Sequence, residues 1–131
     1  MRRFTLMAVM LLMTLCFQSS PAWSLDRFVN LNDGTVLDTV SSLRWLKNAN
    51  CYSYKNWYTA MSSAANLASS SCGLTDGSIA GDWHLPTKEE LRIFTDAGYR
   101  TNTLDAVGFS DVQTIYWSST TYAIDTNYAW R

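Results

Sequence analysis

The clearest structural signal in the chain is the stretch Trp83-His84-Leu85-Pro86-Thr87-Lys88-Glu89-Glu90-Leu91. Thr87 and Glu90 have the spacing of a capping box, in which each side chain accepts a hydrogen bond from the backbone N–H of the other residue. Leu91 and Phe94 follow on one face, as in an amphipathic helix. We therefore expect a helix that begins after Thr87 and packs through this face. Gly98 is its expected end, because glycine readily terminates helices.

A second helix is expected on the amino-terminal side of this stretch. Asn56 is a suitable N-cap, and the apolar residues after it recur at helical spacing. These residues are Trp57, Ala60, Met61, Ala64, Leu67 and Ala68. Residues 72–81 follow, and their richness in Gly, Ser, Thr and Asp predicts an exposed loop between the two helices.

Strands are expected at both ends of the domain. Residues 28–31 and 35–38 flank Asn32-Asp33-Gly34, and Asp-Gly favours a tight hairpin turn. Residues 43–46 alternate in the manner of a half-buried strand. After an irregular stretch over residues 99–114, two more strands are expected. They would cover residues 115–120 and 127–130. Strands at both ends with helices between them predict an α+β domain with a mostly antiparallel sheet.

The amino end has the order of a secretory signal. Arg2 and Arg3 precede the apolar run 4–17, which leads to Ala22-Trp23-Ser24. We expect residues 1–24 to be a cleavable signal peptide and residues 25–131 to be one exported domain. The apolar run is shorter than the roughly 20 residues that span a bilayer, so a permanent membrane span is not expected.

Lipid anchoring is a weaker interpretation of the same region. Cys16 closes the apolar run, but bulky Leu15 precedes it where lipid-attachment sites prefer a small residue. The whole chain has a formal net charge of −1, and the loss of Arg2 and Arg3 would make the domain more negative. This balance does not favour a nucleic-acid partner.

Cys51 and Cys72 are the two cysteines that remain beyond the signal. An even number in an oxidising compartment favours one disulfide, with two buried free thiols as the alternative. Their spacing matches neither a redox CxxC motif nor a zinc site, and His84 is the only histidine. No nucleophile or carboxylate accompanies His84 at a recognisable catalytic spacing, so neither a metal site nor catalysis is expected.

Five blocks of the chain, taken in order, resemble the bacterial Lcl C-terminal domain family. They are Arg27-Phe28 with residues 32–36, Leu43-Arg44-Trp45, Trp57 with Ala60, residues 83–91, and Tyr116-Trp117-Ser118-Ser119-Thr120. The resemblance covers residues 27–131 and implies a C-type-lectin-like fold, with a curled sheet, two flanking helices and long loops that carry binding. It also implies a surface adhesin that binds glycans, including sulfated ones. Family members continue with further strands, so we expect the domain to be incomplete at Arg131.

Most residues of these blocks are expected to pack rather than to bind. This structural set comprises Trp45, Trp57, Trp83, Leu85, Pro86, Thr87, Glu90, Leu91, Trp117, Ser118 and Ser119. Tyr122, Tyr128 and Trp130, near the last turn, are the candidate ligand contacts. Sulfated ligands are not favoured, because the Lys and Arg residues are scattered under a negative net charge.

No cofactor is predicted. Asp105, Asp111, Asp125 and Asn127 offer oxygens that suit calcium, but they lack the spacing of an EF-hand and are interpreted as solvated turn residues. We expect a non-enzymatic module that binds glycan or protein in the periplasm, at the cell surface or after secretion. A relative of formylglycine-generating oxidases and a truncated remnant without a ligand stay as alternatives. The sequence leaves the oligomeric state open.

Overall fold

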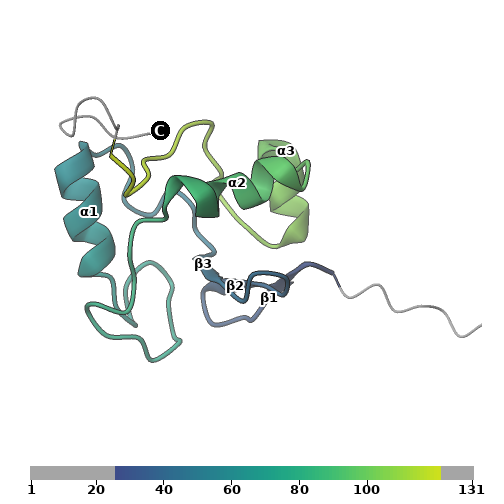
Figure 1. Ribbon diagram of the computed structural model, residues 1–131. Coiled ribbons are helices and arrows are strands. Elements are labelled where there is room, and N and C mark those ends of the chain that lie inside the picture. Colours follow the sequence, from purple (N-terminus) through teal and green to yellow (C-terminus); the bar gives the residue numbers. More distant parts are fainter. Residues whose placement is uncertain (1–25, 122–131) are drawn as a thin grey trace, which may run out of the picture.

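The computed structural model describes residues 26–121. It contains three strands, three α-helices and one 3-10 helix (Figure 1). In chain order these are β1 (Phe28–Asn30), β2 (Thr35–Asp38), β3 (Arg44–Leu46), α1 (Trp57–Ala65), α2 (Lys88–Asp96), α3 (Thr101–Leu104) and η1 (Asp105–Val107). None of the helices between residues 26 and 121 is long and apolar enough to cross a bilayer.

The three strands form one antiparallel sheet in the order β1-β2-β3. Val29 pairs with Leu37 across the hairpin, and Val36 pairs with Trp45 of β3. Gly34 in the connecting turn has a φ of 86°, as an Asp-Gly turn requires. The predicted hairpin and third strand are therefore confirmed, and the domain is α+β with an antiparallel sheet, consistent with a small C-type-lectin-like fold.

The capping box sets the residue at which helix α2 begins. Thr87 Oγ1 accepts from Glu90 N at 3.1 Å, and Glu90 Oε2 accepts from Thr87 N at 2.7 Å. Ile93 and Phe94 then pack against the main core, whose fully buried members are Phe28, Val36 and Phe109. Half-buried side chains complete this cluster: Trp45, Tyr99, Leu104, Val107 and Val112.

Helix α1 and the 66–86 loop lie to one side of this core (Figure 1). Leu67 and Leu74 of this loop are 3% and 1% exposed, but neither belongs to the cluster around Phe28. The domain therefore has a main core between the sheet and α2, and separate buried leucines beneath the loop.

Two predicted boundaries were wrong. The expected first helix reached Ala68, whereas α1 ends at Ala65 with Asn66 as its C-cap. The Asn66 side chain donates to Ser62 O at 2.8 Å, and Leu67 turns inward from the loop. Residues 99–114 are not wholly irregular, because they contain α3 and η1. Arg100 N starts this turn by donating to Thr103 Oγ1 at 2.8 Å.

The strand expected over residues 115–120 is also wrong, since no strand is assigned there. Polar groups of this segment bond instead to α1 and to the start of α2. Ser118 O accepts from Trp57 Nε1 at 2.8 Å, and Ser119 N donates to Pro86 O at 2.7 Å. The strand expected over residues 127–130 lies outside the described residues.

Candidate functional site

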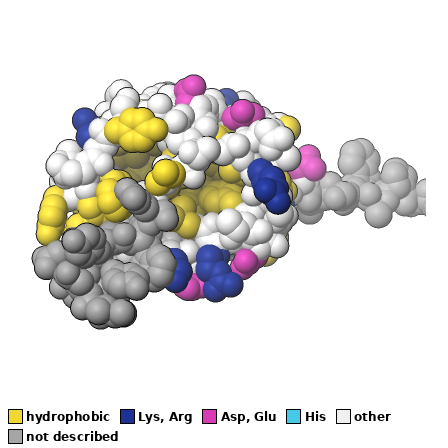
Figure 2. Space-filling model, turned by 90° about the horizontal axis from the view of Figure 1, so that it is seen from above, with side chains coloured by type: hydrophobic (Ala, Val, Ile, Leu, Met, Phe, Trp, Pro, Cys, Tyr) yellow, Lys and Arg dark blue, Asp and Glu magenta, His cyan; other side chains and the backbone are white. Residues whose placement is uncertain are grey.

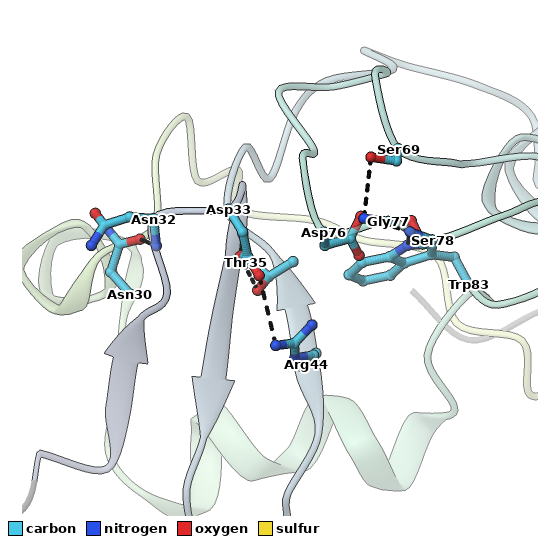
Figure 3. Close-up of polar contacts among 10 residues, drawn as sticks. All are labelled: Asn30, Asn32, Asp33, Thr35, Arg44, Ser69, Asp76, Gly77, Ser78 and Trp83. Carbon is cyan, nitrogen blue, oxygen red and sulfur yellow. Dashed lines mark hydrogen bonds and ion pairs between the residues drawn. The ribbon is translucent and has the colours of Figure 1, made fainter.

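A polar turn joins β1 to β2. Asp33 Oδ1 accepts hydrogen bonds from the Thr35 backbone N–H at 3.0 Å and from the Thr35 hydroxyl at 2.5 Å. Asp33 Oδ2 lies 3.6 Å from Arg44 Nη2 on β3 (Figure 3). The Thr35 hydroxyl bond is the main reason that the pKa of Asp33 is lowered, and Arg44 adds a smaller effect. Asp33 is thus held as a carboxylate in one orientation.

The 66–86 loop repeats this arrangement. Asp76 Oδ1 accepts from the Ser78 backbone N–H at 3.2 Å and from the Ser78 hydroxyl at 2.7 Å. Gly77 N donates to Ser69 Oγ at 3.2 Å, and Trp83 Nε1 donates to Ser78 Oγ at 3.0 Å (Figure 3). Asp33-Gly34-Thr35 and Asp76-Gly77-Ser78 are therefore two copies of one local structure.

Backbone contacts hold the two turns together. Thr75 N, next to Asp76, donates to Asp33 O at 2.8 Å, whereas the bond from Lys47 N to Gly34 O at 2.9 Å ties the hairpin turn to the end of β3. A Cβ added to Gly34 would lie 2.8 Å from Leu74 Cα, closer than real side chains allow. Glycine at this position therefore permits the loop to pack directly on the hairpin turn.

The predicted disulfide between Cys51 and Cys72 is confirmed, with a Cα–Cα distance of 5.6 Å. It joins the segment after β3 to the middle of the 66–86 loop, next to Gly73. We name the polar residues of this region the turn-and-loop surface. It comprises Asn30, Asn32, Asp33, Thr35, Arg44, Ser69, Asp76, Gly77, Ser78 and Trp83 (Figure 3).

Three of the motif tryptophans make structural hydrogen bonds at the edge of the fold. Trp57 donates to Ser118 O, Trp83 to Ser78 Oγ, and Trp117 to Lys55 O at 2.9 Å. The Trp57 and Trp117 bonds tie residues 117–118 to α1 and its entry, whereas the Trp83 bond lies within the 66–86 loop. Half-buried rings with one bonded N–H are typical of tryptophans that join elements at a surface.

Trp45 lies deeper, with its ring centroid 4.7 Å from that of Phe94. Its Nε1 is buried and finds no hydrogen-bond partner among residues 26–121. Leu85, Pro86 and Leu91 are half-buried around the start of α2. Trp45 therefore contributes to the main core.

His84 and Glu90 meet at the start of α2, where Glu90 serves helix capping. His84 Nε2 lies 3.6 Å from Glu90 Oε2, which also accepts the Thr87 N–H. Burial by itself raises the pKa of Glu90. The hydrogen bonds with the Thr87 backbone and hydroxyl, with a smaller contribution from His84, lower it by more, so the pKa of Glu90 lies below its ordinary value. Glu90 is thereby kept ionised at the start of α2.

Metal ligands do not gather in the described part of the chain. Between residues 26 and 121, no three His, Cys, Asp or Glu side chains could hold one ion. Asp105 and Asp111 therefore form no such group there, and Asp125 and Asn127 lie outside the described residues. Tyr122, Tyr128 and Trp130, the predicted ligand contacts, also lie outside them.

The sequence analysis missed the turn-and-loop surface as a unit. Its signal is the repetition of Asp-Gly followed by a hydroxyl residue, at Thr35 and again at Ser78. Only the first copy stands out, because it sits between two strands. Figure 2 shows another face, on which hydrophobic side chains gather in a hollow.

The profile of the Lcl C-terminal domain matches residues 34–131. Comparisons with curated protein sequences and with solved structures found no significant match. The match covers most of the chain and includes the Asp76-Gly77-Ser78 turn, the disulfide and the start of α2; it begins at Gly34, after Asp33 of the first turn. The chain therefore belongs to the Lcl C-terminal domain family.

Proposed function

We propose that this chain is an exported, non-enzymatic binding module that recognises a glycan or a protein ligand through its turn-and-loop surface. The observation that carries the proposal is the pair of Asp-Gly-hydroxyl turns, docked on each other by Thr75 N–H and Asp33 O. Their two carboxylates and the partly exposed Ser78 hydroxyl are fixed before any ligand arrives, whereas Thr35 is buried and serves to orient Asp33.

Such pre-organisation favours binding because little side-chain entropy is lost on association. Asp76 and Ser78 are oriented by each other, and Trp83 is oriented by Ser78. A half-buried aromatic ring beside fixed polar groups suits ligands with both apolar and hydroxyl faces, such as sugars or polar peptide segments.

Two features favour binding over catalysis. The sulfurs of Cys51 and Cys72 are joined, so in this state neither offers the thiol that a formylglycine-generating chemistry would use. His84 and Glu90 are engaged at the start of α2 rather than with a nucleophile. Export is supported by the disulfide, because such bonds persist mainly in oxidising compartments.

The test is a binding screen of the oxidised chain against a glycan array and a panel of extracellular matrix proteins. For any ligand found, Asp76→Asn and Arg44→Ala should each weaken affinity about tenfold, equivalent to about 1.4 kcal/mol. Binding that is unchanged by both substitutions would contradict the assignment of this surface.

Asp96→Asn is the matched control, because it makes the same chemical change as Asp76→Asn on a different element. Asp96 is exposed on α2 and pairs only loosely with Arg92, at 3.8 Å. Its affinity should equal that of the unmodified chain. Silence of the oxidised chain across the whole panel would contradict adhesion to these ligand classes.

A further inference from the structure

The main hydrophobic core does not include the buried leucines of the 66–86 loop. The main core gathers residues of the sheet, α2 and residues 99–112 around Phe28. The buried Leu67 and Leu74 stand outside it. Figure 1 shows α1 and the 66–86 loop on one side, and α2 and α3 on the other. A segment that lies outside the main core can open locally while the core stays folded.

A short series of contacts holds the 66–86 loop against the β1–β2 hairpin. Gly34 O accepts from Lys47 N, and Gly34 packs on Gly73. Cys51 lies four residues after Lys47 and is bonded to Cys72, which precedes Gly73. The disulfide is the covalent link in this series of contacts.

The loop backbone at this link is strained. Ser70 and Cys72 have φ values of 77° and 54°, and Gly73 has 78°. Left-handed backbone is unfavourable for a residue with a side chain, and it persists only where the surroundings impose it. The Cys51–Cys72 bond and the Leu74 contacts supply that constraint here.

We propose that the Cys51–Cys72 disulfide is a redox latch for the turn-and-loop surface. Its reduction lets the strained loop relax and leave the hairpin turn, while the sheet and α2 remain folded. The oxidised domain then presents both Asp-Gly turns together, and the reduced domain presents only the one at Asp33. The loop opening stands by itself; its effect on ligand binding rests on the proposed function.

The reaction is a thiol–disulfide exchange with a dithiol reductant. One thiolate of the reductant attacks the sulfur of Cys51 or Cys72, the bond between the cysteines breaks, and a mixed disulfide forms. The second thiol of the reductant then displaces the remaining cysteine. Two protein thiols and one oxidised dithiol result. Both cysteines are partly exposed, which allows this attack.

Hydrogen exchange measured by mass spectrometry on the full chain, oxidised and after dithiothreitol treatment, tests the latch without any ligand. Amides bonded in the docked loop, Ser70, Leu74 and Thr75, should exchange at least tenfold faster after reduction. Amides of the main core, such as Asp38 in the sheet and Tyr99 after α2, should change less than twofold. Uniform acceleration of all of these amides, or no acceleration in the loop, would overturn the proposal.

Two variants distinguish the effect of losing the disulfide from any other effect of dithiothreitol. The double change Cys51→Ser and Cys72→Ser should reproduce the reduced pattern with no dithiothreitol present. Gly34→Ala disturbs the docking with the disulfide intact, and its loop amides should accelerate in the oxidised chain. Failure of the ligand screen would leave these exchange results standing, whereas an unchanged loop in the double variant would refute the latch alone.

Discussion

At the scale of single residues, Asp38 is the charged side chain that is completely buried within the described part of the chain. Burial raises the pKa of this carboxyl, but hydrogen bonds from Arg27, Ser41 and the Val40 N–H, with the Arg27 charge, lower it to about 2. Arg27 holds it through two bonds, at 2.9 Å and 3.1 Å. This pair ties the entry of β1 to the end of β2.

The Asp38 carboxylate should make stability depend on acid. Its ordinary pKa is 3.8 and its folded pKa is about 2, so its contribution is complete above pH 3.8 and is lost as pH falls toward 2. At pH 7, Asp38→Asn should lower the free energy of unfolding by roughly 2–3 kcal/mol and flatten this acid dependence. Urea unfolding between pH 2 and 7 measures both. An equal loss in exposed Asp96→Asn would contradict this account.

Gly34 and Gly77 form a matched pair for testing how the loop docks. Both have positive φ, but a Cβ on Gly34 meets Leu74, whereas a Cβ on Gly77 meets nothing within 4 Å. Gly77→Ala should therefore cost about 1 kcal/mol of unfolding free energy, from the backbone alone. Gly34→Ala should cost more than about 2 kcal/mol. Equal costs in denaturant unfolding would show that close contact with the loop is unimportant.

At the scale of elements, α2 depends on its reciprocal cap. Thr87→Ala removes the acceptor for Glu90 N and should lower the free energy of unfolding by about 1 kcal/mol. Thr87→Ser keeps the hydroxyl and should recover most of that loss. Urea unfolding followed by circular dichroism measures the three proteins. A serine variant as unstable as the alanine variant would refute the capping explanation.

The elements that could be predicted from sequence are those with local signals. The Asp-Gly turn, the Asn56 cap and the Thr87–Glu90 box act within four residues, so the chain itself displays them. Residues 115–120 have the composition of a strand, but their bonding is decided by distant groups. Trp57, for example, reaches Ser118 across 61 residues. A β pattern of this kind cannot reveal whether a strand partner lies beside it.

The candidate site was only partly predictable for the same reason. The first Asp-Gly turn is predictable because it lies between two strands, and the two cysteines favour a disulfide, whereas the second turn lies in a loop and does not stand out. The packing of the two turns on each other depends on the close approach of Gly73 to Gly34, which no short sequence pattern predicts. The separation of Leu67 from the main core likewise follows from the end of α1 at Ala65, one turn earlier than its apolar spacing indicates.

At the scale of the whole molecule, the domain combines a firm core with a covalently fastened loop. The sheet and α2 supply rigidity through Phe28 and Phe94, whose rings stack with centroids 5.4 Å apart. The loop supplies polar groups that the core positions but does not bury. A rigid core that carries exposed polar loops suits a scaffold whose loops recognise a ligand.

The most direct test of the central claim is an NMR titration of the oxidised, ¹⁵N-labelled chain with a soluble ligand from the binding screen. We predict that the largest shift changes fall on Asn32, Asp33, the amides of residues 76–78 and the Trp83 indole N–H. Shift changes confined to α2 and α3, with these signals unmoved, would contradict the assignment of binding to the turn-and-loop surface.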